Sequence, residues 1–157
     1  MITMLGSSTP QLTLYLPNPP QQLPPAMSPT KPDIAQLTEL NGNHWRKIFT
    51  ILAKLSAPND NWRDYRDRQL LQHSEQICFA DELEAHPGWH LVAGKTSWQR
   101  LGLSDDKGVS GEMFCLEEQG RLFRQGHVLL VPYPDYRQFP NQLIEQVRGI
   151  LHPNATL

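Results

Sequence analysis

Cysteine is scarce in this sequence, with only Cys78 and Cys115 among 157 residues. Neither belongs to a Cys-x-x-Cys pair, which excludes a cysteine-based zinc site and a disulfide framework. Both lie in apolar stretches, a context typical of small buried side chains in a reducing compartment. We therefore expect neither cysteine to act as a catalytic nucleophile.

Histidine spacing suited to a metal ion is also lacking. His86 and His90 are four residues apart, but Pro87 and Gly88 break the helix that would aim both rings at one ion. No third ligand follows at a recognisable spacing. The sequence predicts no metal and no cofactor.

Long hydrophobic runs are missing as well. No run approaches the roughly 18 apolar residues of a membrane span. The first residues, MITMLGSSTPQ, have neither the basic start nor the long apolar stretch of a signal peptide. We interpret the chain as a cytoplasmic protein with no membrane partner.

An excess of positive charge is absent, because the formal net charge is −2. Strong non-specific binding to nucleic acids comes mostly from neutralising phosphates, so this charge argues against such a protein. It leaves room for a local basic surface. Gly94-Lys95-Thr96 matches the end of a phosphate-binding P-loop, but Trp89 stands where the first glycine is required. A nucleoside triphosphatase is therefore excluded.

Proline, in contrast, is abundant and unevenly placed. Seven of the 14 prolines lie between residues 17 and 32. They follow an apolar alternation at residues 11–16 that predicts a strand. The sequence thus predicts a single domain over residues 1–157 with a proline-rich loop at about 17–32.

Apolar periodicity predicts the remaining elements. Strands are expected at 75–80, 89–93 and 127–131, and helices at 32–40, 43–55, 62–74, 96–101 and from Pro140 to about Leu151. Strands alternating with helices favour an α/β class. We expect a three-layer α/β/α sandwich around a mostly parallel sheet of about four strands.

Ligands of such sheets bind beyond the carboxyl ends of the strands. Here those ends carry three short groups of residues: Pro17-Asn18-Pro19, Lys95-Thr96 and Tyr133-Pro134-Asp135, the last followed by Arg137. Proline holds neighbouring polar groups in place at a low entropic cost, as a binding site requires. A merely rigid surface loop has the same composition, so both interpretations stay open.

Four segments in this order resemble the uracil-DNA glycosylase superfamily, especially its small bacterial and mismatch-specific branches. LYLPNPP is similar to the first strand-end motif of that superfamily, and GNHWRKIFTILAKL resembles its following helix. HLVAGKTSWQRLGL resembles the internal strand and turn-helix, and GHVLLVPYPDYRQFPNQLIEQV the last strand, loop and helix. The similarity runs from about residue 12 to 151, with short motifs.

The resemblance implies a hydrolase of N-glycosidic bonds that acts in DNA repair. Asn18 corresponds to the residue that positions the attacking water, and Tyr133 falls where a catalytic histidine or asparagine stands. Pro17, Pro19, Lys95, Thr96, Pro134, Asp135 and Arg137 are the expected ligand-binding residues. The expected partner is DNA or another ligand that contains a nucleobase.

The motifs also depart from the superfamily in ways that affect the chemistry. Leu16-Pro17 replaces the glycine before Asn18, and Asp135 replaces a serine and adds negative charge beside the DNA backbone and the departing base. A base that leaves as an anion requires donors instead. The alternative hypothesis is therefore a catalytically inactive member that acts as a ligand- or protein-binding module.

Overall fold

The structure is a computed structural model that describes residues 2–153. These residues form, in chain order, β1 (Met4–Gly6), β2 (Leu12–Tyr15), α1 (Ile34–Asn41), α2 (Asn43–Ser56), α3 (Trp62–Arg68), β3 (Glu75–Cys78), β4 (Trp89–Ala93), α4 (Lys95–Arg100), β5 (Ser104–Asp105), β6 (Gly108–Val109), β7 (Phe114–Cys115), β8 (Phe123–Gln125), β9 (Val128–Val131) and α5 (Asn141–Leu151). Residues 16–33, which include the proline-rich loop, contain neither helix nor strand.

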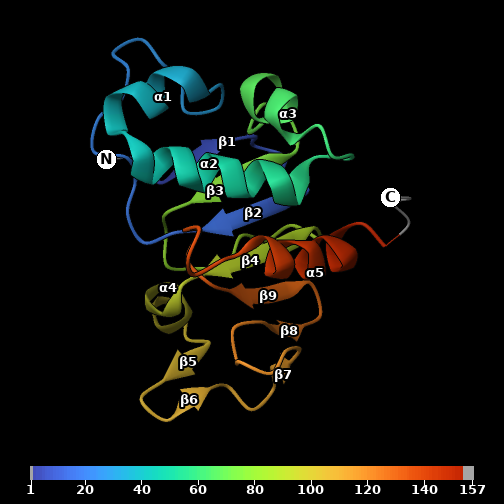
Figure 1. The fold of residues 1–157 in the computed structure, drawn as a ribbon. Helices are drawn as coiled ribbons and strands as arrows, with labels where there is room; N and C mark the ends of the chain where they lie inside the picture. Colours follow the sequence, from blue (N-terminus) through green and yellow to red (C-terminus); the bar gives the residue numbers. More distant parts are fainter. Residues whose placement is uncertain (1, 154–157) are drawn as a thin grey trace.

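The main sheet is mixed and has the strand order β1-β3-β2-β4-β9-β8-β7. Its four central strands β3, β2, β4 and β9 are parallel, whereas β1, β8 and β7 pair antiparallel at the two sides. The parallel strands all end on one side, at left in Figure 1, where the arrowheads point. β5 and β6 form a separate hairpin.

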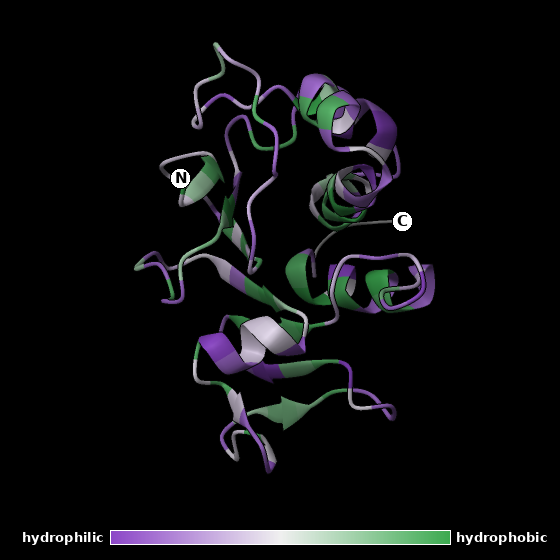
Figure 2. Ribbon diagram, turned by 90° about the vertical axis from the view of Figure 1, so that its left-hand side faces the viewer, coloured by the Kyte–Doolittle hydropathy of each residue, from purple (hydrophilic) through white to green (hydrophobic). Residues whose placement is uncertain are grey.

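The predicted three-layer sandwich around a mostly parallel sheet of about four strands is therefore wrong. The sheet has seven strands, and half of its strand pairings are antiparallel. The long helices gather on one face of the sheet, as the view along the strands shows (Figure 2). The physical reason is that a ten-residue return from β3 to β4, residues 79–88, contains no helix and leaves the second face without a full helical layer.

Alternation along the central strands builds the main core. Leu12, Leu14 and Leu91 point to the face covered by α2 and α5, where they are almost fully buried. The apolar stripe predicted for residues 43–55 is confirmed, since α2 buries Trp45 and Ile48 together with its later apolar residues against this face. The strand ends and the start of α2 are thus fixed to one another by a shared core.

The second face of the sheet is covered in part by α4, through Trp98, and in part by residues 80–88, which side-chain hydrogen bonds attach to the strands. The backbone N–H of Gly88 donates to Nδ1 of His86 (3.0 Å), so the proton of the neutral ring is on Nε2, which donates to Thr13 Oγ1 (2.8 Å). His90 donates from Nε2 to the carbonyl of His86 and accepts from the Tyr15 hydroxyl at Nδ1 (2.7 Å). A proton on Nδ1 of His86 would face the N–H of Gly88, so this contact is kept only while the His86 ring is neutral.

We expect this attachment to make stability fall in mild acid. Burial, and then the charge of His90, lower the pKa of His86 below its usual value near 6.5. A folded-state pKa below the unfolded one gives stability that is complete above about pH 6.5 and is lost as the pH falls through the folded-state pKa. Urea unfolding between pH 8 and 5 should show that the free energy of unfolding falls more steeply with decreasing pH in the wild type than in His86→Gln. His73→Gln, at an exposed position, should retain the wild-type slope; equal slopes in all three proteins would contradict the assignment.

Two expectations about local structure fail. The third helix ends at Arg68 instead of extending to residue 74, and the chain then turns through Leu71, whose φ of 64° lies in the left-handed region. Cys78 is buried as predicted, but Cys115 is exposed because β7 lies at the edge of the sheet. No helix among residues 2–153 is long and apolar enough to cross a membrane.

Candidate functional site

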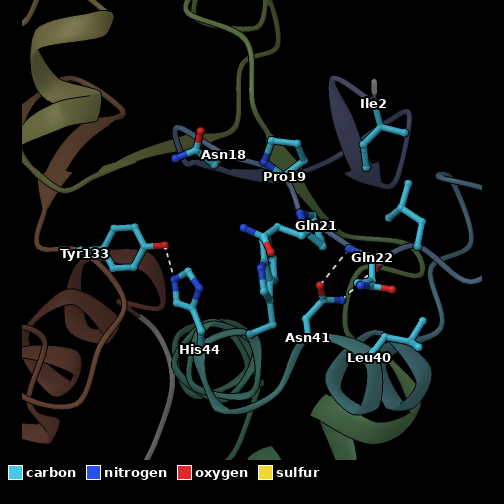
Figure 3. A pocket seen from close by; sticks show the side chains of 12 residues that line it. Ile2, Asn18, Pro19, Gln21, Gln22, Leu40, Asn41, His44 and Tyr133 are labelled. Atoms are coloured by element: carbon cyan, nitrogen blue, oxygen red, sulfur yellow. Dashed lines mark hydrogen bonds between the residues drawn. The ribbon is translucent and has the colours of Figure 1, made fainter.

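A cavity of about 750 Å³ opens where β2 and β9 end and α2 begins. Both predicted catalytic residues, Asn18 and Tyr133, line it, and Figure 3 shows them on different loops beside the first turn of α2. We call it the strand-end cavity. Its lining residues are Ile2, Asn18, Pro19, Pro20, Gln21, Gln22, Leu23, Leu40, Asn41, His44, Trp45 and Tyr133.

His44 and Tyr133 form a bonded pair on one side of the cavity. The Tyr133 hydroxyl lies 2.7 Å from Nε2 of His44, and the two rings stack with their centroids 5.7 Å apart. A neutral tyrosine and a neutral histidine hold two polar hydrogens between them, and one is used in their mutual bond. The other remains for a ligand, on Nδ1 of His44 or on the Tyr133 hydroxyl.

Gly94 holds Tyr133 in position from the neighbouring strand end. A Cβ atom at residue 94 would lie 3.3 Å from two side-chain carbons of Tyr133, and the φ of Gly94 is +87°. Only glycine tolerates this close approach in this conformation. The strand-glycine-helix turn predicted at β4 therefore packs directly against the loop that carries Tyr133.

The loop that carries Asn18 is fixed to the junction of α1 and α2. Asn41 accepts from the backbone N–H of Gln22 (3.0 Å) and donates to the carbonyls of Gln22 and Leu37 (both 2.8 Å). The Asn18 side chain is exposed and makes no hydrogen bond to another described residue. Its amide is thus available to a ligand, while Asn41 has a structural role.

The cavity lining carries no Asp, Glu, Lys or Arg side chain among the described residues. Asp135, on the loop of Tyr133, instead lies 3.6 Å from the Lys47 ammonium. Burial, and then the negative charge of Asp135, raise the pKa of the Tyr133 hydroxyl, so that it remains a neutral phenol at physiological pH. The cavity thus offers neutral donors and acceptors.

The start of α2 adds a partial positive charge beside this neutral lining. Gly42 caps α2 without a side-chain hydrogen bond, and His44 and Trp45 in the first turn both line the cavity. The first N–H groups of a helix have no partner within it, and the helix dipole is positive at this end. This arrangement favours a ligand group that is electron-rich or becomes negative.

The other predicted binding residues are only partly brought together. Pro19 lines the cavity, but Pro17 does not. Lys95 and Thr96 are exposed at the start of α4 and contribute nothing to the lining.

On the last loop, Tyr133 alone reaches the cavity. Pro134 is buried, Asp135 pairs with Lys47, and Arg137 is exposed. Of the site residues that the sequence predicted, only Asn18, Pro19 and Tyr133 therefore line the cavity.

His44 lines the cavity but is not among the site residues that the sequence predicted. It lies within the GNHW segment, next to residues of the buried stripe of α2. The available signal was its place in the first turn after Gly42, off the apolar stripe, where a polar side chain borders whatever the helix start faces. Among residues 2–153 no group of three or more His, Cys, Asp or Glu side chains is arranged to hold a metal ion.

Comparison with known proteins assigns no activity to this cavity. Residues 3–152 match the profile of a protein family described as "Family of unknown function (DUF6942)". No curated protein and no solved structure matches the chain. The matched range includes both loops of the strand-end cavity.

Proposed function

The chain belongs to the DUF6942 family, and we propose that it binds a ligand containing a nucleobase in the strand-end cavity. One observation carries the proposal: Asn18 and Tyr133, far apart in the sequence, line one cavity together with His44. The cavity volume of about 750 Å³ falls within the usual range of small-molecule sites and leaves room for a nucleoside.

The chemistry of the lining suits a nucleobase. The edge of a base combines neutral hydrogen-bond donors and acceptors in one plane, and the Asn18 amide offers the complementary groups. The His44–Tyr133 pair adds one polar hydrogen. The aromatic rings of Tyr133, His44 and Trp45 also line the cavity, and such rings are worth about 1–3 kcal/mol when a base stacks on them.

The same residues support a hydrolytic role. In this extension of the proposal, Asn18 positions a water that attacks the anomeric carbon. The bond from that carbon to the base nitrogen breaks, and the base leaves with the electron pair while the water proton passes to solvent. The free hydrogen of the His44–Tyr133 pair and the positive end of α2 stabilise the departing anion.

Binding without hydrolysis is the second candidate, and one observation favours it. No carboxylate among the described residues lines the cavity, so no Asp or Glu side chain is placed to act as a general base on the water. Tyr133, at the position where the resemblance places a catalytic histidine or asparagine, also favours binding without hydrolysis. Under this candidate the cavity binds a base without cleaving its bond to the sugar.

The Tyr133→Phe variant tests the binding site. It removes the hydroxyl bonded to His44 and should weaken binding of a single-stranded, uracil-containing oligonucleotide about tenfold, the effect of losing about one hydrogen bond. Tyr136→Phe is the matched control, because Tyr136 is exposed on the same loop and does not line the cavity. Fluorescence anisotropy measures both. Equal affinities of the two variants would refute the assignment.

An excision assay separates the two candidates. Uracil-, hypoxanthine- and thymine-mismatch oligonucleotides are incubated with wild type and Asn18→Ala, and strand scission is measured after alkaline treatment. Hydrolysis predicts cleavage by the wild type that Asn18→Ala loses. Binding without hydrolysis predicts no cleavage by either protein, together with retained affinity in the anisotropy assay.

A further inference from the structure

A second cavity, of about 400 Å³, lies at the opposite end of the parallel strands. Leu12, Glu75 and Trp89, the first residues of β2, β3 and β4, line it, together with Tyr65 of α3 and Ser56 at the end of α2. We call it the strand-start cavity. It shares no lining residue with the strand-end cavity.

Glu75 gives this cavity an unusual carboxyl group. Its side chain is only 2% exposed, yet it forms no ion pair with any described Lys, Arg or His side chain. The Tyr65 hydroxyl donates to Oε2, and the backbone N–H of Leu71 donates to Oε1 (2.9 Å). A carboxylate accepts about four hydrogen bonds, so capacity remains for further donors.

Ser56 adds a second polar group, which has no hydrogen-bond partner among the described residues. Ser56 Oγ is inaccessible to solvent and makes no hydrogen bond to another described residue. Buried hydroxyls are normally satisfied, so the protein leaves a polar group unmet beside this cavity. His152 lines the same cavity and donates from Nε2 to the carbonyl of Leu55 (2.8 Å), so the Nδ1 of its neutral ring is an acceptor.

The backbone that supports Glu75 is strained. Leu71 is fully buried and has a φ of 64°, a left-handed conformation that is unfavourable for any residue other than glycine. The backbone N–H of this same residue donates to the Glu75 carboxyl. Strained residues gather at binding sites because the surrounding structure holds a functional group in place. The carboxyl of Glu75 is held in this way from two directions, by α3 and by the turn before β3.

From this arrangement we infer that the strand-start cavity binds a primary amine with a short apolar body. An ammonium group carries three donors and a positive charge. It complements the carboxyl of Glu75, which has no ion-pair partner among the described residues, and the Nδ1 acceptor of His152. Leu12 and Leu151 line the same cavity and give the apolar body a surface. The site is separate from the proposed nucleobase site and does not depend on it.

The test uses n-butylammonium chloride as the probe, with 1-butanol and sodium butyrate as matched neutral and anionic compounds. Two-dimensional NMR spectra of the full chain follow each titration. The inference predicts saturable shifts from the amine at Trp89 and Tyr65, and weaker effects from the alcohol and the acid. Glu75→Gln keeps the shape of the side chain and should weaken amine binding about tenfold or more, because it removes the charge-assisted bond.

Two further variants keep the test decisive if Glu75→Gln does not fold. Ser56→Leu fills the cavity from a half-buried position and should abolish the amine-dependent shifts. Tyr136→Phe, at the other end of the strands, should leave them unchanged. Equal binding of 1-butanol, shifts that do not saturate, or unaltered affinity in either cavity variant would overturn the inference.

Discussion

The Gly94→Ala variant is expected to lose the ligand and part of its stability at once. The φ of +87° and ψ of 151° at Gly94 belong to a region that is essentially restricted to glycine, and a side chain there costs about 1–3 kcal/mol. The added methyl group would also press on two carbons of Tyr133 at 3.3 Å. Tyr133 then moves, and its bond to His44 breaks or lengthens.

Gly102→Ala separates the two effects of that substitution. Gly102 follows the same helix, α4, with a φ of +74°, but a Cβ atom there would meet nothing within 4 Å. Its strain of about 1–2 kcal/mol should lower the melting temperature without changing oligonucleotide affinity. Unchanged affinity in Gly94→Ala as well would show that the position of Tyr133 does not matter for the ligand.

Gly88→Ala should have the largest effect on stability. A Cβ atom at residue 88 would lie 2.1 Å from the carbonyl oxygen of Gln11 and 2.7 Å from its carbon, so the backbone itself has to move. Overpacking of this kind costs about 3 kcal/mol or more. The N–H of Gly88 donates to His86, and the carbonyl of Gln11 accepts from the N–H of Trp89. A shift of this backbone would weaken both bonds, so residues 80–88 should detach from the sheet.

Urea unfolding and hydrogen exchange measure this loss. Gly111→Ala is the matched control, because the position is open and its φ is ordinary, and it should retain wild-type stability. Increased exchange in Gly88→Ala should be greatest at Glu84 and Gly88, whose N–H groups donate to side chains of this network. A stable Gly88→Ala protein with wild-type exchange would contradict the close contact with Gln11.

Elements with long apolar periods were predictable from the sequence. The stripe of α2 fixes the burial of that helix, because only one of its faces is apolar. The continuous apolar runs of β4 and β9 instead indicate strands that are buried on both faces of the sheet, as both are. The meeting of Asn18 and Tyr133 follows from the parallel course of β2 and β9, which ends both strands on one side.

The short outer strands were not predictable in the same way. β1, β7 and β8 have two or three residues each, too few to show an alternation. β1 also pairs with β3, which lies far away in the sequence. Residues 80–88 carry no periodic pattern either, because hydrogen bonds from His86, His90 and Tyr15 attach them, where a helix would use an apolar stripe. These two features explain why the sandwich expectation failed.

The strand-end cavity places neutral polar side chains at the positive end of a helix, where we propose that a nucleobase binds. The most direct measurement is the NMR response of the Asn18 side-chain amide and the His44 ring nitrogens to added deoxyuridine. We expect saturable shifts at both residues, reduced in Tyr133→Phe, with the resonances of Trp89 at the opposite end of the strands unchanged. No shift at Asn18 or His44 up to the solubility limit of the nucleoside would contradict it.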